Sequence, residues 1–198
     1  MFTGIVSHQG LFRGYRQGRQ EMRLEAAGLE AKLRQGDSLA VNGVCLSLLN
    51  AEGKSLFFNL SAETVSLTNL GRLKPGDRLN LELPLTLSDL VSGHLVTGHV
   101  DGLGKVIKIT QRRPGKRLRL AFSPDLRPFL VPKGSVAVNG VSLTVAGLEA
   151  LSVDLELIPL TLEGTNLASL RGGDLVNIEC DMIGKYVYNC VLGSRKEG

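Results

Sequence analysis

The feature that most constrains the fold is an internal repeat, because the chain must adopt a structure that can be built twice. A shift of 97 residues places AVNGVCLSL (40–48) over AVNGVSLTV (137–145) and also places residues 64–82 over 161–179. Nine of the 19 positions in the second pair are identical. Unrelated sequences of ordinary composition would share roughly one or two. The two halves are therefore copies of one unit.

A second match extends the repeat toward the start of each copy. With a shift of 94, the segment TGIV (3–6) lies over TGHV (97–100), and the change in shift corresponds to a short difference in loop length. We expect two tandem domains over residues 1–96 and 97–182, followed by a tail over 183–198.

Each copy shows the pattern of short strands. The segments SLFFNL, VDLELI, RLNLELP and DLVNIEC, which begin at residues 55, 153, 78 and 174, are rich in β-formers or alternate with period two. In the repeated motif, an Asn-Gly pair separates two apolar runs and predicts a tight turn or a bulge. About six short strands per copy, with turns every 8–12 residues, favour a small closed barrel without exposed sheet edges.

Helical patterns are few. We expect short helices near residues 61–70 and 160–167, and a third in the tail, where Asp181 is a candidate N-cap. The tail carries Ile183, Val187, Cys190 and Val191 at helical spacing, which predicts an apolar stripe that another subunit would cover.

Composition indicates a soluble globular protein. Hydrophobic residues make up 43% and charged residues 21% of the chain. The net charge of +4 is too small to indicate nucleic-acid binding, and the basic run QRRPGKRLR (111–119) is typical of a solvated hairpin. Three cysteines without metal-type spacing read as reduced thiols, and no apolar run approaches the roughly 18 residues of a membrane span. We expect a cytoplasmic protein that binds neither membranes nor nucleic acid.

Strand parity gives the repeated motif a chemical meaning. Successive side chains point to opposite faces, so Cys45 and Ser47 share one face, and Ser142 and Thr144 share the equivalent face in the second copy. Each barrel would then present a small polar pair outside an apolar core. Small polar residues on a solvent-facing strand are common, so this pair alone leaves a purely structural role open.

Several motifs together carry a resemblance to a known family. MFTGIV at residue 1, NGVCL at 42, GHLVTGHVDG at 93, NGVSLTV at 139 and GKYV at 184 resemble, in this order, the riboflavin synthases of the alpha-chain type. The resemblance spans about residues 1–190. It implies an all-β chain of two tandem six-stranded antiparallel Greek-key barrels with a short C-terminal helix.

The resemblance also implies an activity. Riboflavin synthases transfer a four-carbon unit between two molecules of 6,7-dimethyl-8-ribityllumazine, which yields riboflavin and 5-amino-6-ribitylamino-uracil. The family uses no metal and no organic cofactor. It forms homotrimers, with a working site between the N-terminal barrel of one subunit and the C-terminal barrel of its neighbour, and lumazine synthase is a candidate partner.

Two pockets carry over from the family residue by residue. The N-terminal pocket would use Gly4, Ile5, Val6, Cys45, Leu46, Ser47, Asn59, Leu60, Ser61, Ala62, Glu63 and Thr64. The C-terminal pocket would use Gly98, His99, Val100, Lys133, Ser142, Leu143, Thr144, Glu156, Leu157, Ile158, Pro159, Leu160 and Thr161. Catalytic or site-lining positions would be Phe2, Ser38, Cys45, His99, Ser142, Thr144 and Asp181.

The chemistry of these residue types suits the reaction. The Cys45 thiolate is the strongest nucleophile available near neutral pH, although a small buried hydrophobic role stays open for this residue. His99 can move a proton, whereas we expect His94 to be structural. Ser142 can orient a ring and help to remove a methyl proton.

Two positions depart from the family. Asn139 stands where several members have Asp, and Leu160 replaces a polar residue, so an acid–base role at the first and a side-chain contact at the second are in doubt.

A ligand carrier similar to the lumazine proteins is the alternative to an enzyme. The TGHV segment, the thiol and SLTV are all present, and this combination favours the enzyme.

Overall fold

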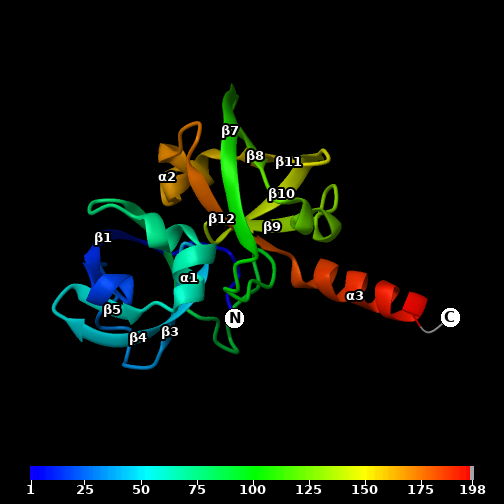
Figure 1. Ribbon diagram of the computed structural model, residues 1–198. Coiled ribbons are helices and arrows are strands. Elements are labelled where there is room, and N and C mark those ends of the chain that lie inside the picture. The colour runs from blue at the N-terminus through cyan, green and yellow to red at the C-terminus, as the bar shows by residue number, and fades with distance from the viewer. Residues whose placement is uncertain (197–198) are drawn as a thin grey trace.

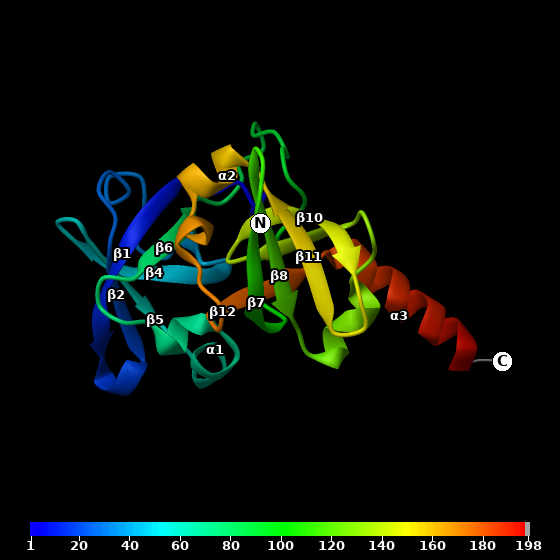
Figure 2. The same cartoon turned by 90° about the horizontal axis from the view of Figure 1, so that it is seen from above.

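The computed structural model describes residues 1–196, with side chains described as far as Val191. The chain forms two closed six-stranded barrels that lie side by side, with one helix extending away from them (Figures 1 and 2). The last two residues of the expected tail, 197 and 198, lie outside the described residues.

Both barrels have the same strand order, and all neighbouring strands are antiparallel. The first barrel closes in the order β1-β2-β5-β4-β3-β6, and the second repeats it as β7-β8-β11-β10-β9-β12. This confirms the expected pair of six-stranded Greek-key barrels. The strands of the first barrel are β1 (His8–Arg16), β2 (Glu21–Glu25), β3 (Ser38–Val41), β4 (Val44–Glu52), β5 (Ser55–Asn59) and β6 (Arg78–Glu82). Those of the second are β7 (Gly102–Arg112), β8 (Gly115–Ala121), β9 (Ser135–Val138), β10 (Val141–Leu148), β11 (Ser152–Leu157) and β12 (Leu175–Cys180).

Short helices occupy matching places in the two halves. Helix α1 (Ala62–Leu67) follows β5, and α2 (Pro159–Gly164) follows β11. The third helix is α3 (Met182–Lys196). Asp181 precedes it, and its carboxylate accepts a hydrogen bond from the Ile183 N–H at 3.0 Å, as the N-cap pattern predicts. Single 3₁₀ turns complete the chain: η1 (Gln17–Arg19), η2 (Asn69–Arg72), η3 (Pro124–Phe129) and η4 (Asn166–Ser169).

Each barrel has its own apolar core, and strand alternation fills it. Val44, Leu46 and Leu48 point into the first core, whereas Cys45 is half-buried and Ser47 is exposed. The same alternation places Val141, Leu143 and Val145 in the second core, with Ser142 and Thr144 pointing outward. Strand parity therefore predicted the two faces correctly. No helix among the described residues is long and apolar enough to cross a membrane.

The Asn-Gly pairs are two-residue hairpin loops that bring the barrels together. Asn42 and Gly43 have φ angles of 46° and 77°, the positive values of a type I′ turn, and Asn139 and Gly140 match them with 46° and 76°. The two glycines touch across the interface: a Cβ built on Gly43 would lie 2.6 Å from the Gly140 nitrogen. A side chain at either glycine would push the barrels apart.

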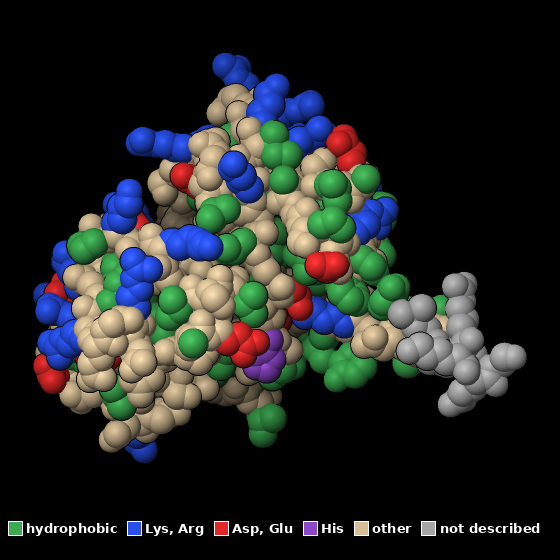
Figure 3. Space-filling view, viewed as in Figure 1, with side chains coloured by type: hydrophobic (Ala, Val, Ile, Leu, Met, Phe, Trp, Pro, Cys, Tyr) green, Lys and Arg blue, Asp and Glu red, His purple; other side chains and the backbone are tan. Residues whose placement is uncertain are grey.

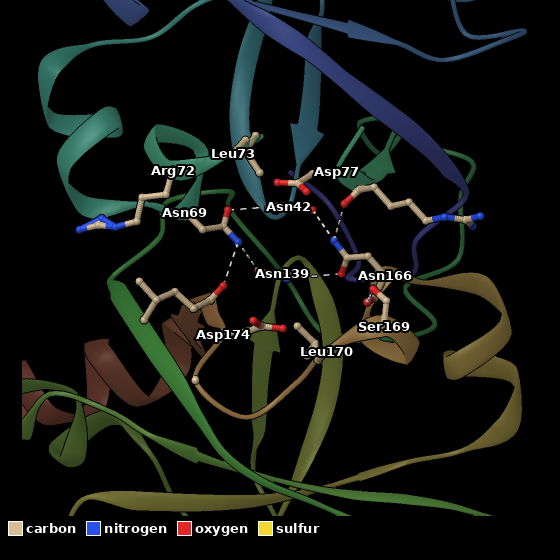
Figure 4. A pocket seen from close by; sticks show the side chains of 13 residues that line it. Asn42, Asn69, Arg72, Leu73, Asp77, Asn139, Asn166, Ser169, Leu170 and Asp174 are labelled. Atoms are coloured by element: carbon tan, nitrogen blue, oxygen red, sulfur yellow. Dashed lines mark hydrogen bonds between the residues drawn. The ribbon is translucent and has the colours of Figure 1, made fainter. Parts of the chain in front are cut away.

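A buried network of side-chain amides surrounds this contact (Figure 4). Asn69 Nδ2 donates to Asn139 Oδ1 at 3.0 Å, and Asn166 Nδ2 donates to Asn42 Oδ1 at 3.0 Å. The network comprises three repeat-related pairs: Asn42 and Asn139, Asn69 and Asn166, Asn80 and Asn177. Each member of a pair makes the bonds of its counterpart, so the interface has approximate twofold symmetry.

This network gives Asn139 a structural role. Its Oδ1 accepts from the backbone N–H of Asn177 at 2.8 Å, and its Nδ2 lies 3.4 Å from Asn166 Oδ1, to which it donates. The side chain is 2% exposed and faces the other barrel. Asn139, where several family members have Asp, therefore belongs to the interface between the barrels. It does not line the Cys45 pocket described below.

We predict that Asn69→Ala destabilises the whole chain. The substitution removes the acceptor for the amides of Asn177 and Asn42 and leaves the Asn139 oxygen with one donor fewer. Buried polar groups without partners cost about 2 kcal/mol in the free energy of unfolding. Urea unfolding monitored by circular dichroism measures this loss. Asn50→Ala, which changes an exposed amide bonded to Glu52, is the control, and an equal effect of both variants would contradict the prediction.

Candidate functional site

On the outward face of the first barrel, Cys45 is covered by a segment from the second copy of the repeat. The Cys45 N–H donates to the Gly98 carbonyl at 2.9 Å, and Val100 packs against the first core. Gly98 has a φ of +83°, and a Cβ built on it would lie 2.5 Å from the Cys45 Cβ. Only glycine permits this approach. The segment Gly98–Val100 therefore forms a wall beside the thiol.

The reciprocal arrangement covers the second barrel. The Ser142 N–H donates to the Gly4 carbonyl at 2.8 Å, Val6 packs against the second core, and a Cβ on Gly4 would lie 2.6 Å from the Ser142 Cβ. We expected Gly4–Val6 to serve the Cys45 pocket and Gly98–Val100 to serve the Ser142 pocket, and that division is wrong. Both segments cross to the opposite barrel, and the Phe2–Val96 bridge joins them where they run side by side.

Two buried carboxylates hold the crossing segments. Glu82 accepts hydrogen bonds from the Thr3 N–H at 2.6 Å, the Thr3 hydroxyl at 2.7 Å and the Gly4 N–H at 3.0 Å. Glu179 holds Thr97 and Gly98 in the same way, at 2.7, 2.7 and 3.0 Å. Burial raises the pKa of both carboxyls, and the donated hydrogen bonds oppose that shift. Each pocket wall is thus anchored to the barrel from which its segment departs.

A pocket opens beside Cys45. It has a cavity volume of about 280 Å³ and is lined by Val44, Cys45, Glu63, Thr64, Leu67, Thr68, Gly98, His99 and Val100. Helix α1 supplies Glu63 and Thr64, and Ser61 caps this helix by accepting from the Thr64 N–H at 3.0 Å. The pocket combines a thiol, an imidazole, a carboxylate and a hydroxyl.

The rest of the expected first-barrel segment lies on a neighbouring hollow. Asn59, Leu60, Ser61 and Ala62 line a second cavity of about 580 Å³ together with residues 17–20. The segment 59–64 therefore borders two adjacent spaces: Glu63 and Thr64 line the Cys45 pocket, and the four residues before them line the larger hollow.

The Ser142 side has a different polar environment. His94 Nδ1 lies 2.7 Å from Ser142 Oγ, within hydrogen-bond distance. Burial lowers the pKa of His94, and the negative charge of Asp181 acts in the opposite direction. The structure thus brings Ser142 and Asp181 into the surroundings of one imidazole. Thr161 occupies in α2 the place that Thr64 has in α1.

Other expected site residues are placed outside these pockets. Phe2 is fully buried between the barrels against Ala40, Val96 and Ala137, so its side chain is part of a core. Leu46, Leu143 and Leu157 point into the barrel cores, which leaves only their backbone for a ligand.

The remaining expected residues lie at strand edges. Ser38 pairs with Ser47 across β3 and β4, next to the pairing of Ala40 with Cys45. Glu156 accepts from the Arg117 guanidinium at 2.6 Å. Lys133 lies just before β9, and its N–H donates to the Val145 carbonyl in β10 at 2.9 Å.

Comparison with known proteins identifies the family. The lumazine binding domain matches the chain twice, over residues 3–84 and 97–181. The riboflavin synthase of Bacillus amyloliquefaciens is 39% identical over 190 residues, which cover 95% of this chain and 88% of the relative. That of Mycobacterium tuberculosis strain H37Rv is 39% identical over 193 residues and covers 94% and 96%. The chain belongs to the riboflavin synthase family.

Solved structures show the same fold in a more distant protein. LumP complexed with riboflavin superimposes with a TM-score of 0.83, covering 91% of this chain and 99% of that chain, at 22% identity. LumP complexed with 6,7-dimethyl-8-(1'-D-ribityl) lumazine gives a TM-score of 0.81, also at 22% identity. At this identity the likeness supports the two-barrel fold alone.

In this riboflavin synthase family member, the surroundings of Cys45 and those of Ser142 differ at matched positions. Where the Cys45 side has Ser61, Glu63 and His99, the Ser142 side has Ile158, Leu160 and Ile5. These three apolar side chains are 56%, 74% and 48% exposed. The Ser142 side therefore has exposed apolar side chains where the Cys45 side has polar groups. Leu160, which departs from the family, is one of these apolar side chains.

The sequence patterns did not predict three contacts near the site. His94 was expected to be structural, and its contact with Ser142 was not foreseen. Glu82 and Glu179 were read only as ends of strands. Their identity across the repeat was a usable signal, because a carboxylate kept in both copies at the end of an apolar strand indicates a shared polar contact.

We predict a characteristic pH dependence for Glu82→Gln. A carboxyl whose pKa is higher in the folded state adds stability at low pH, and that contribution is lost as the pH rises through its folded pKa. The stability of the native chain relative to Glu82→Gln should therefore fall as the pH rises from about 4.5, as measured by urea midpoints.

Glu25→Gln should show the opposite pH dependence of stability. Its hydrogen bonds with Arg13 and Arg23 lower the pKa of Glu25, so the native chain should gain stability relative to this variant as the pH rises. Parallel curves for the two variants would contradict the assignment of Glu82.

Proposed function

We propose that this chain is a riboflavin synthase that acts on two molecules of 6,7-dimethyl-8-ribityllumazine. One molecule gives a four-carbon unit to the other, and the products are riboflavin and 5-amino-6-ribitylamino-uracil. The observation that carries the proposal is the pair of outward polar strands, each closed by a crossing glycine segment, in a chain of the riboflavin synthase family. Two related pockets suit a reaction between two identical substrates.

The asymmetry of the pockets supports a division of labour. One lumazine must be attacked at C7, and the other must lose a proton from its C7 methyl group. Cys45, with His99 and Glu63 on the same pocket, suits the molecule that is attacked, because a thiolate is the best nucleophile near neutral pH. Ser142 and Thr144 suit the molecule that loses the proton. Two substrates and two products balance without an oxidant or reductant.

The dimensions of the first-barrel spaces fit this substrate class. Drug-sized ligands occupy pockets of about 300–1,000 Å³, and the two cavities bordered by the segment 59–64 measure about 280 and 580 Å³. The ring would lie against Cys45 and Gly98, and the ribityl chain would extend along Asn59–Ala62. The Cys45 N–H is already bonded to Gly98, so the ring carbonyls would bind other backbone groups and the Thr64 hydroxyl.

We propose a cytoplasmic homotrimer in which the N-terminal barrel of one subunit and the C-terminal barrel of the next form the working site. Helix α3 supports this assembly, since it extends beyond the barrels and exposes Ile183, Val187 and Val191 (Figure 1). Its other face is held by Tyr188 against Phe129 at 5.3 Å between ring centroids, and by a 2.7 Å ion pair from Lys185 to Asp101. Lumazine synthase is a candidate partner.

Incubation of the purified chain with 6,7-dimethyl-8-ribityllumazine tests the function directly. We expect riboflavin absorbance to rise, with 5-amino-6-ribitylamino-uracil formed in equal amount. Tight binding without product would overturn the proposal and identify a ligand carrier. Absence of both binding and product would exclude both functions.

We predict that Cys45→Ala lowers turnover by about 100-fold, the lower range for loss of a group that activates the reacting centre. Ligand affinity should change little, because Gly98, Thr64 and Val100 still line the pocket. Steady-state rates and fluorescence titration separate the two effects. Cys45→Ser restores a polar atom at the site, and native turnover in the alanine variant would refute the role of the thiol.

We predict that removal of residues 183–198 produces monomers of low activity. Val187→Asp tests the same stripe with one charge, and Asn189→Asp is the matched change at another exposed position of α3. Sedimentation measures the oligomeric state. A trimeric, active truncation would contradict the assembly proposed for the tail.

A further inference from the structure

The linker between the barrels places a histidine on Ser142. His94 Nδ1 lies 2.7 Å from Ser142 Oγ, and the His94 N–H donates to the Thr3 carbonyl at 3.1 Å. The preceding residue is Gly93, where a Cβ would lie 2.1 Å from the Thr3 oxygen and 2.9 Å from the Ser142 Cβ. The backbone at Thr3, Gly93 and Ser142 is therefore closely packed, and this packing holds the His94 imidazole next to the serine hydroxyl.

The far side of the same imidazole lacks a partner. His94 Nε2 is buried and has no hydrogen-bond partner among the described residues. A buried polar atom without a partner is costly and asks for a functional explanation. Burial keeps the imidazole neutral near pH 7, which leaves one ring nitrogen able to accept a proton. Asp181, from the start of α3, is the charged group whose field acts on this ring.

The thiol pocket has no equivalent histidine. A shift of 97 residues places Gly93 and His94 over Cys190 and Val191, which belong to α3. The histidine that lines the Cys45 pocket, His99, comes instead from the crossing segment and lies where the other half has Ile5. The contact between His94 and Ser142 is therefore specific to one pocket.

We infer that His94 is the positioning residue of Ser142 and receives the proton that Ser142 relays from the C7 methyl group of the lumazine in that pocket. This inference rests on the proposed function. The methyl C–H bond breaks and an O–H bond forms at Ser142 Oγ, while the original serine O–H proton moves to His94 Nδ1. The products of the step are a carbanion delocalised over the ring and an imidazolium, which the Asp181 carboxylate stabilises. No oxidant or further reactant is required.

Deuterium exchange of the methyl group tests this step apart from the full reaction. The native chain in D₂O should accelerate loss of the C7 methyl signal of 6,7-dimethyl-8-ribityllumazine in proton NMR spectra. His94→Gln and Ser142→Ala should each slow the catalysed exchange by about 100-fold, the usual lower range for general base catalysis. Because the two residues act as one unit, the double variant should be no slower than either single variant.

A second histidine provides the matched control. His8 Nδ1 lies 2.8 Å from Ser7 Oγ, the same pairing on the surface of β1. His8→Gln should leave methyl exchange unchanged. His94→Asn keeps a nitrogen or oxygen near the position of Nδ1 and should preserve the fold and ligand affinity. Loss of exchange with intact melting temperature and affinity separates the proposed role from a structural one.

The pH profile supplies a readout that a packing role would not move. Exchange by the native chain should fall on acidification through the pKa of His94, which lies below the ordinary value of 6.5, because the imidazolium cannot accept a proton. His94→Asn should lack this limb. Native exchange rates in both His94 variants, or an unchanged acid limb, would overturn the inference while riboflavin formation by the native chain would still uphold the proposed function.

Discussion

The fold depends on a cluster of six buried side-chain amides that joins the two barrels. An amide group both donates and accepts hydrogen bonds. Asn42, Asn69 and Asn80 can therefore bond to the asparagines of the second copy, and the asparagines of the second copy make the same set of bonds in return. The close-up view shows four of these amides, those of Asn42, Asn69, Asn139 and Asn166, pointing toward one another from both barrels (Figure 4). A carboxylate at any of these positions would lose its donor, and an apolar residue would leave several partners unsatisfied. The symmetric cluster thus fixes how the halves sit together.

That fixed arrangement makes the pockets possible. Because the barrels meet through glycine turns, the segments before β1 and before β7 lie close enough to cross to the opposite barrel, where Gly4 reaches Ser142 and Gly98 reaches Cys45. Glu82 and Glu179 tie each segment back to its own barrel. The Cys45 pocket and the surroundings of Ser142 are therefore each built from both halves. On the face shown in Figure 3, cationic side chains gather over the tip of β7 and over the outer side of the first barrel.

The repeat and the alternation of side chains predicted most of the fold. Period-two patterns located β5, β6, β11 and β12, the Asn-Gly pairs located the hairpins, and strand parity placed Cys45 and Ser142 outside the cores. The crossing of the glycine segments could not be predicted in this way. A repeat specifies what each copy contains, but it carries no information about which copy a flexible flanking segment contacts. The same reason hid His94, since a linker has no counterpart to compare with.

The two copies of the repeat are identical at some positions and different at others, and opposing physical requirements explain both groups. The interface needs equal halves, and the identities between the copies include its asparagines, its turn glycines and the carboxylates that hold the walls. A reaction between two identical molecules needs unlike halves, because one substrate must gain a bond where the other loses a proton. Differences suited to this need lie on the outward faces, at Cys45 against Ser142, His99 against Ile5 and Glu63 against Leu160. None of the three side chains on the Cys45 side takes part in the amide cluster, so each could change without cost to the contact between the barrels.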